Sequence, residues 1–158
     1  IHLDCAKRVL RYVSGTMDCG ILYKTTMPIR LEGYTDADWA GYKADRRSTF
    51  GFVFSLGSGA ISWSSKKQPT VTLSSTEAEY RGTMVAACEA VWLKRILKDL
   101  GVRIKDPTPL FCDNMSNIYL ARNPVFHACT KHIELHYHFI RERVLVGDVD
   151  LQHISINL

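Results

Sequence analysis

The sequence predicts one domain of the mixed α/β class, in which an antiparallel meander of three strands is followed by strands that alternate with helices. Three apolar runs joined by short polar loops indicate the meander. A long helical pattern comes next, and then two short apolar strands with helical segments between them, an order that favours parallel additions to a sheet. The chain has 158 residues, enough to bury a core of this kind.

The composition is that of an ordinary globular protein, with 46% hydrophobic and 23% charged residues. No apolar run approaches membrane-spanning length and no signal-peptide pattern opens the chain, so we expect no membrane partner. The net charge of +4 leans mildly towards anionic partners. Five scattered cysteines predict reduced thiols in an intracellular compartment. Because the first residue is Ile1 rather than Met, we expect the chain to be cut from something longer.

The first segment predicts a helix over residues 2–14, ended by Ser14-Gly15. Apolar side chains recur at helical spacing, and three cations lie largely elsewhere on its surface: Leu3, Ala6, Leu10 and Val13, then Lys7, Arg8 and Arg11. That basic face is either a solvated surface or a nucleic-acid contact. A short strand is predicted over residues 20–24, followed by a loop that contains Pro28.

The central strand of the meander is predicted from Ile29 onward and presents Asp36 where it ends, with Asp38 two residues later. Aspartates close strands as turn residues, so this position alone leaves a turn and a functional site both open. Residues 41–47 form a polar loop.

The next two runs complete the meander through their period of two. Residues 48–55 place Phe50, Phe52 and Phe54 on one face. A glycine-rich turn at 57–59 leads into a strand over residues 60–65, with Ile61 and Trp63 predicted on one face. At its exit Lys66 and Lys67 could meet phosphates or belong to a charged loop.

The longest helix is predicted to begin at Ser74 and to run to about Leu100, with Gly101 ending it. Ser74 and Glu77 form a capping box, in which the serine accepts from the third helical amide and the glutamate reaches back to the serine amide. Residues two apart on a helix are separated by about 200° of rotation, so Glu77 and Glu79 cannot face one site. Since Glu77 has a capping role, Glu79 is assigned to the site. Gly82, one turn later, leaves room for another element.

Residues 109–114 form a short apolar strand that again presents an aspartate, Asp113. A short helix over 114–121 is closed by Asn123-Pro124, a further helix covers 131–146, and a last strand covers 149–154.

Three acidic residues therefore stand out: Asp36 and Asp113 at strand ends, and Glu79 in the first turns of the long helix. Gathered carboxylates repel one another unless a cation lies among them. Hard oxygen ligands of this kind suit Mg²⁺ or Mn²⁺. A pair of such ions can activate water and stabilise the leaving oxygen in phosphodiester cleavage.

The sequence resembles the ribonuclease H domain of copia-type (Pseudoviridae-like) retrotransposon polyproteins, with plant elements as the nearest likeness. The motifs that carry the resemblance span almost the whole chain: YTDADWAG (34–41), DRRST (45–49), GAISW (59–63), SKKQPTV (65–71), LSSTEAEY (73–80), CDN (112–114), TKHIE (130–134) and HFIRE (138–142). The stretch AKRVLRY (6–12) resembles the segment that links reverse transcriptase to ribonuclease H.

The resemblance implies a ribonuclease H-like fold, a five-stranded mixed sheet with three antiparallel strands and two parallel ones, flanked by helices. It implies hydrolysis of the RNA strand of an RNA–DNA hybrid with two Mg²⁺ ions, with Asp36 bridging both ions and Glu79 and Asp113 binding the second. Residues 1–28 would be the connection from the reverse transcriptase side, and 29–158 the ribonuclease H domain. The order of the three acids separates this family from integrases and transposases of the same fold, whose catalytic glutamate comes last.

The implied partners are the hybrid and the reverse transcriptase domain of the same polyprotein, in a cytoplasmic retrotransposon particle or in the nucleus. A hybrid would be recognised by shape and by its 2′-hydroxyl groups across the minor groove. Candidates for contact with its backbone are Asn114, Ser116, Lys66 and Lys67.

The family also has a fourth carboxylate, in a Leu-Ala-Asp sequence on a helix after the last strand. Residues 155–158 contain no acid. We therefore expect this chain to lack the last helix, to have an intact second metal site and a weak or absent first one, and to have low activity. The histidine that cellular relatives carry after the fifth strand has no counterpart, because His153 is expected within the strand.

Two other readings compete with this one. His127, Cys129, His132, His136 and His138 invite a zinc site, although 132 and 138 belong to motifs that the family carries without zinc. The chain could also be a retroelement-derived protein that binds nucleic acid or protein without cleaving. Mg²⁺-dependent cleavage that is lost on Asp36→Asn separates the enzyme from the binding module.

Overall fold

The computed structural model describes residues 2–41, 44–122 and 131–155. These residues form four helices and five strands. In chain order the elements are α1 (His2–Gly15), β1 (Leu31–Asp38), β2 (Thr49–Leu56), β3 (Gly59–Lys67), α2 (Ser75–Asp99), β4 (Thr108–Cys112), α3 (Met115–Arg122), α4 (Lys131–Val146) and β5 (Val149–His153).

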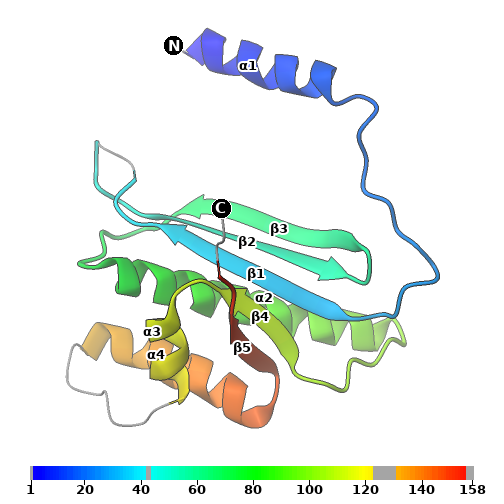
Figure 1. The fold of residues 1–158 in the computed structure, drawn as a ribbon. Helices are drawn as coiled ribbons and strands as arrows, with labels where there is room; N and C mark the ends of the chain where they lie inside the picture. The colour runs from blue at the N-terminus through cyan, green and yellow to red at the C-terminus, as the bar shows by residue number, and fades with distance from the viewer. Residues whose placement is uncertain (1, 42–43, 123–130, 156–158) are drawn as a thin grey trace.

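The strands form one mixed sheet in the order β3-β2-β1-β4-β5, with β1 at its centre (Figure 1). β1, β2 and β3 pair antiparallel, as the meander predicts. β4 joins the other edge of β1 in parallel, and β5 joins β4 in parallel. The mixed α/β class and the five-stranded mixed sheet are therefore both confirmed.

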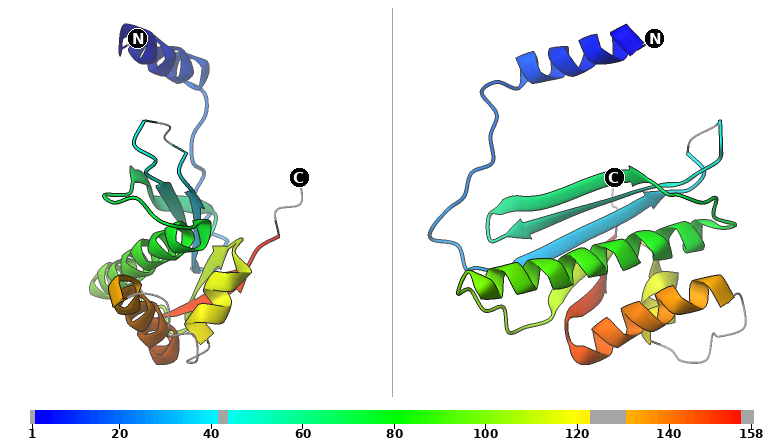
Figure 2. Two further views of the ribbon diagram at one scale, coloured as in Figure 1. Left: turned by 90° about the vertical axis from the view of Figure 1, so that its left-hand side faces the viewer. Right: turned by 180° about the vertical axis from the view of Figure 1, so that it is seen from behind.

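The core lies between this sheet and α2, which crosses one of its faces (Figure 2). Strand alternation supplies the sheet side of the core, and small residues of α2 let the helix approach closely. Buried members of this core include Leu31, Phe54, Tyr80, Ala86, Ala90, Leu110, Ile140 and Leu151. The other face of β1–β3 keeps Tyr34, Val53 and Trp63 exposed.

Gly82 allows a close approach of α2 to the sheet. A Cβ on this residue would lie 3.2 Å from Phe50 Cβ and 3.7 Å from Ala37 Cβ. The expectation that Gly82 makes room for another element is therefore confirmed, and that element is the sheet at β1 and β2.

The strand predicted over residues 20–24 is wrong. These residues lie along the β2–β3 turn without joining the sheet, and side chains make the contacts. Tyr23 donates its hydroxyl to Ala60 O at 2.6 Å, and the backbone amide of Lys24 donates to Ser58 Oγ at 2.8 Å. A local pattern of apolar residues is the same whether or not a neighbouring strand is present to form backbone hydrogen bonds with it. The sequence pattern therefore could not show that residues 20–24 lack such a partner.

The shared face predicted for Ile61 and Trp63 is also wrong. A bulge in the β2–β3 pairing at Phe54/Ser55 shifts the register. Ile61 packs against the core, whereas Trp63 lies opposite Val53 and is 66% exposed. One extra residue in a strand reverses the side to which the following residues point.

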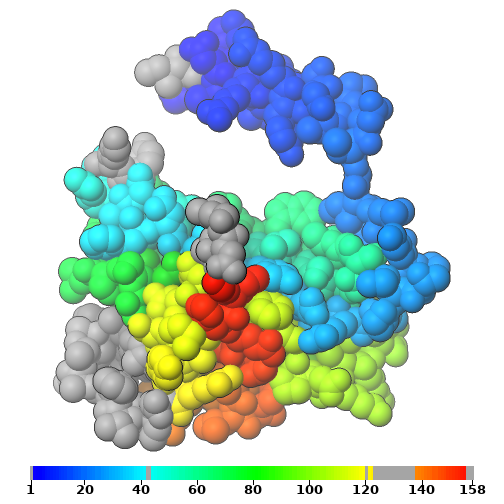
Figure 3. All heavy atoms as spheres, in the orientation of Figure 1, coloured from blue at the N-terminus to red at the C-terminus, as the bar shows by residue number. Residues whose placement is uncertain are grey.

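α1 stands apart from the sheet and its helices, joined to them by the segment that leads into β1 (Figure 3). None of its residues is buried, although its apolar side chains follow the helical period. No helix in the described ranges combines the length and the apolar character that crossing a bilayer would require. Asn123-Pro124, predicted to close α3, falls outside the described residues.

Candidate metal and active site

Two of the three predicted acids come from neighbouring parallel strands. Asp36 is the sixth residue of β1 and lies on its exposed face, while Asp113 directly follows β4. Tyr34 pairs with Phe111 in the β1–β4 register, so counting on by two residues brings Asp36 level with Asp113. β1 continues two residues past Asp36, so this acid lies just inside the strand rather than at its last position.

The third acid, Glu79, comes from the first turns of α2 and is buried. Its Oε1 accepts a hydrogen bond from the backbone amide of Ala37 at 3.2 Å, which ties the helix to β1 beside Asp36. Helical geometry turns Glu77 elsewhere, as expected. Glu77 accepts from the Leu73 amide at 2.8 Å and pairs with Arg81 at 2.8 Å.

The predicted capping box is therefore correct in one half and altered in the other. Ser74 is the N-cap of α2 and accepts from the Glu77 amide at 3.1 Å. The return bond from Glu77 goes to the amide of Leu73, one residue before the serine. Since the cap sets where α2 begins, it also sets the place of Glu79 one turn later.

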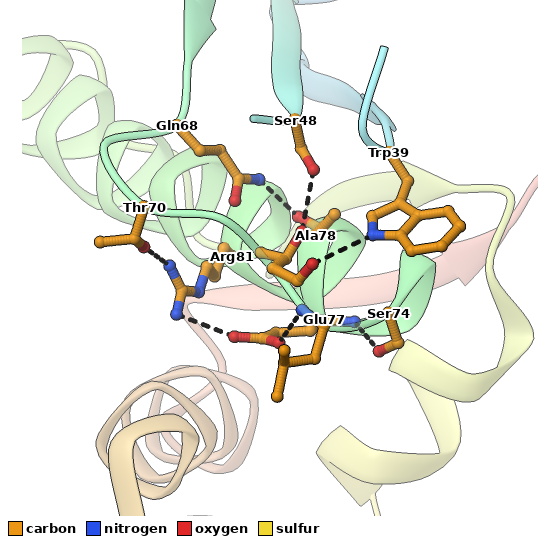
Figure 4. A network of polar contacts seen from close by, with 10 residues as sticks. Trp39, Ser48, Gln68, Thr70, Ser74, Glu77, Ala78 and Arg81 are labelled. Atoms are coloured by element: carbon orange, nitrogen blue, oxygen red, sulfur yellow. Dashed lines mark hydrogen bonds and ion pairs between the residues drawn. The ribbon is translucent and has the colours of Figure 1, made fainter. Parts of the chain in front are cut away.

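A network of polar contacts fixes this end of α2 to the loops around it (Figure 4). Trp39 donates its indole N–H to Thr72 O at 3.3 Å, and Ser48 Oγ lies 2.9 Å from Thr72 Oγ1. Gln68 donates to Ala78 O at 2.9 Å inside the first turn of α2. These contacts join segments far apart in the chain, and the sequence patterns did not reveal them.

Together these elements bring Asp36, Glu79 and Asp113 into one cluster. One carboxylate oxygen from each lies within 4.8 Å of the others. Burial, and then the charges of Asp113 and Asp36, raise the pKa of Glu79 to about 7, against a hydrogen bond from Ala37 that lowers it. A buried acid facing two other acids is costly to ionise unless a cation neutralises it.

The donor set fits a divalent cation. Glu79 Oε2 and Asp113 Oδ1 are buried, and neither has a hydrogen-bond partner among the described residues. Three clustered carboxylates, of which Asp36 is exposed to solvent, match the oxygen ligands that Mg²⁺ and Mn²⁺ prefer alongside water and phosphate.

The residues predicted to contact substrate come from two places, the start of α3 and the end of β3. Asn114 accepts from the Ser116 amide at 2.9 Å and so caps α3, while Ser116 itself is exposed. Lys67 lies level with Thr49 in the β2–β3 register and reaches Asp45 at 2.8 Å. Lys66 is exposed and pairs with Phe50 in the β2–β3 register. Its Cα–Cβ bond therefore points to the face of the sheet opposite to that of Lys67.

A hollow of about 340 Å³ lies beside the acids on the exposed face of the sheet. Asp36 and Asp113 line it together with Tyr34 and Phe111, whose rings stack at 4.9 Å. This aromatic pair was not singled out in the sequence. Side chains two residues apart in a strand point to the same face, so Tyr34 shares a face with Asp36 and Phe111 with Asp113. This rule could have identified the aromatic pair from the sequence.

His153 lies in β5, as expected, and is its last residue, because the strand ends one residue before the predicted end at Ile154. Its Nε2 lies 3.1 Å from the backbone carbonyl oxygen of Asp113. Of the histidines and cysteine considered for zinc, His127 and Cys129 fall outside the described residues, as do the side chains of His132 and His136, while His138 is exposed.

No family model matches the chain, but several curated proteins are similar to it in sequence. The chain is 47% identical over 154 residues to the retrovirus-related Pol polyprotein from transposon RE1 of Arabidopsis thaliana, which covers 98% of this chain and 10% of the polyprotein. It is 44% identical over 156 residues to the corresponding polyprotein from transposon TNT 1-94 of Nicotiana tabacum, covering 99% of this chain and 11% of that one. The chain thus spans about a tenth of the length of these relatives.

Solved structures show the fold. LC11-RNase H1 in complex with an RNA/DNA hybrid has a TM-score of 0.58 at 13% identity, covering 80% of this chain and 86% of that one. The foamy viral protease-reverse transcriptase in complex with an RNA/DNA hybrid also has a TM-score of 0.58 at 13% identity, covering 87% of this chain and 19% of that one. Both likenesses place the sheet and helices described above in the ribonuclease H fold.

Proposed function

Because this chain is a ribonuclease H-fold relative of the Pol polyproteins of copia-type retrotransposons, we propose that it hydrolyses the RNA strand of RNA–DNA hybrids with divalent metal ions. The observation that carries the proposal is the cluster of Asp36, Glu79 and Asp113, whose carboxylate oxygens lie within 4.8 Å of one another. Two structures with this fold hold an RNA/DNA hybrid in complex, which supports the choice of substrate.

In the proposed mechanism Asp36, Glu79 and Asp113 would hold Mg²⁺, or Mn²⁺ in its place. The metal would supply activation of a water molecule and stabilisation of the leaving oxygen. The chain's own part is to position the ligands. The bond from Ala37 N leaves Glu79 Oε2 free to carry a proton in the metal-free protein, and the parallel strands keep Asp36 and Asp113 level.

Substrate would lie over the exposed face of the sheet, where the hollow opens beside the acids. Tyr34 and Phe111 offer flat apolar surface there, and Lys67 starts from the same face as Asp36. The exposed Ser116 at the start of α3 and Lys66 are further candidates for contact with the phosphate backbone. We propose that the reverse transcriptase domain of the same polyprotein delivers the hybrid.

The three carboxylates complete one metal site in this proposal, and a second ion would depend on the fourth carboxylate that the family resemblance implies. The direct test incubates a labelled RNA–DNA hybrid with the 158-residue protein, with Asp36→Asn, and with a version extended through that acidic helix. The assay is run in Mg²⁺ and in Mn²⁺.

If the 158-residue protein cleaves the hybrid and Asp36→Asn does not, the result supports the proposed nuclease activity. It would also show that the fourth carboxylate is dispensable for cleavage. Cleavage only by the extended version supports a catalytic core with one weak metal site. Metal-independent binding of the hybrid without cleavage by any version, unaffected by Asp36→Asn, would replace the nuclease with a non-catalytic binding module.

A further inference from the structure

A second charged surface lies at the other end of α2 from Glu79. A hollow of about 460 Å³ is lined by five cationic side chains, one acid and two aliphatic residues: Lys94, Arg95, Lys98, Arg103, Lys105, Asp148, Val91 and Ile104. We call this hollow the basic groove. α2 forms one wall with Arg95 and Lys98, and the extended segment after the helix forms the other with Arg103 and Lys105.

The positive charge of the basic groove is not neutralised from within the protein. Arg95, Lys98, Arg103 and Lys105 are exposed, and none of them forms an ion pair with another residue in the described ranges. The one lining acid, Asp148, is already bound by Arg143 at 3.0 Å. Four cations facing one hollow repel one another, a cost that an anion in the groove would relieve.

The architecture of the fold accounts for only part of this charge. Lys94 has a structural role, since its ammonium group donates to the carbonyl oxygens of Asp106 at 3.3 Å and Asp148 at 3.2 Å. Arg95 and Lys98 lie near the C-terminal end of α2, where cations favour the helix dipole. Arg103 and Lys105 lie outside the helix, so the dipole does not account for them.

The basic groove adjoins a hollow of about 500 Å³, which shares Arg103, Ile104 and Lys105 and adds Arg30 and Asp106. Arg30 is paired with Glu32 and Asp106 adds one negative charge, so the two shared cations leave this hollow with a net positive charge. Charge spread along two adjoining hollows suits an extended polyanion with regularly spaced phosphates better than a single small anion.

We propose that the basic groove binds the phosphodiester backbone of an RNA–DNA hybrid, as a contact separate from the acidic cluster. Sixteen residues of α2 separate Glu79 from Arg95, about 24 Å along the helix. The choice of an RNA–DNA hybrid as the ligand rests on the proposed function. Binding of its backbone in the groove does not require that the chain cleaves it. The groove thus adds affinity that depends on salt and not on base sequence.

The test measures binding of a fluorescently labelled RNA–DNA hybrid by anisotropy in EDTA, over a salt titration. The variants are Arg95→Gln with Lys98→Gln, and Arg103→Gln with Lys105→Gln. Each pair should weaken binding at least about tenfold at 0.1 M salt and make the slope of log K against log salt shallower by about 1.8, the value for two lost phosphate contacts. The charge-keeping pair Arg95→Lys with Lys98→Arg should bind within about twofold of the unmodified protein.

The matched control removes two exposed cations that lie outside the basic groove and outside the predicted substrate contacts, Lys24→Gln with Arg46→Gln. An equal loss in this control would make net charge, rather than the groove, responsible and would overturn the proposal, as would unchanged slopes in both groove variants. Competition by polyglutamate as strong as that by unlabelled hybrid would assign the groove to an acidic protein instead. Cleavage is assayed separately, so a chain that binds through the groove but never cleaves would overturn the nuclease alone.

Discussion

Glu79 meets conflicting demands from its surroundings. Its carboxyl group is buried and faces Asp36 and Asp113, which disfavour its negative charge, while the Ala37 amide favours it. The balance leaves a pKa of about 7 in the metal-free protein. A cation among the three acids would reverse that balance, because it interacts more strongly with the ionised carboxylate than with the neutral acid.

Stability of the metal-free protein should therefore depend on pH through Glu79. Its folded-state pKa of about 7 lies above the ordinary value of 4.5, so the folded protein holds the proton more tightly than the unfolded chain. The contribution is fully present below pH 4.5 and is lost as the pH rises through 7. We expect this group to lower the free energy of unfolding by up to about 3 kcal/mol across that window.

Urea denaturation in EDTA at pH 5 and pH 8 measures this effect, with Glu79→Gln as the comparison. The glutamine variant should lose less stability than the unmodified protein between the two pH values. Equal losses in both proteins would show that Glu79 ionises freely in the folded state.

Mg²⁺ should stabilise the folded protein, and more so at pH 8 than at pH 6, because binding displaces the proton from Glu79. At a concentration a hundredfold above the dissociation constant, the gain is about 2.7 kcal/mol. Thermal unfolding with and without Mg²⁺ measures it. Asp36→Asn and Asp113→Asn should abolish the gain, whereas Asp99→Asn, an exposed acid at the end of α2, should keep it. A gain that survives in both site variants would place the cation elsewhere.

At the scale of elements, β1 joins the site to the core, and Gly33 sets how closely it packs against β2. A Cβ on Gly33 would overlap the ring of Phe54, which is fully buried. Gly33→Ala should therefore destabilise the protein by about 1–3 kcal/mol, the usual cost of overpacking. Chemical denaturation measures it, and Gly20→Ala, with nothing within 4 Å, is the matched control. A neutral Gly33→Ala would mean that the sheet shifts to accept the methyl group.

The elements that the sequence predicted well are those whose signal is local. Two apolar strands that each present an aspartate at their end singled out Asp36 and Asp113, and the angle between residues two apart on a helix separated Glu79 from Glu77. The capping serine marked the start of α2 to within a residue. Three acids from three segments could thus be nominated before any contact between them was known.

The failures have the opposite character, since each depends on a partner distant in the chain. Residues 20–24 have a strand-like pattern but meet the β2–β3 turn through Tyr23 instead of a ladder. A bulge opposite Phe54 separates Ile61 from Trp63. The bond of Trp39 to Thr72 and the gathering of cations from α2 and residues 103–105 in the basic groove exist only after folding.

For the molecule as a whole, α1 should contribute little to the stability of the remainder, because none of its residues is buried. Deleting residues 1–18 retains the contacts of Leu22, Tyr23 and Lys24 with the β2–β3 turn. We expect the free energy of unfolding of the shortened protein to stay within about 0.5 kcal/mol, as for surface changes. Urea denaturation of both lengths measures it, and a loss of several kcal/mol would show that α1 packs on the sheet in solution.

The central place of β1 has a consequence for how the chain is made. β2 and β3 follow β1 at once, but 69 residues lie between Asp38 and the start of β4 at Thr108. At roughly 5–20 residues per second, a ribosome needs about 3–14 s to supply the strand that covers the second edge of β1. Throughout that interval the edge offers unpaired amides and carbonyls to any neighbouring nascent chain. Slow translation between residues 38 and 108 should therefore increase aggregation, while slow translation after β4 has emerged should not.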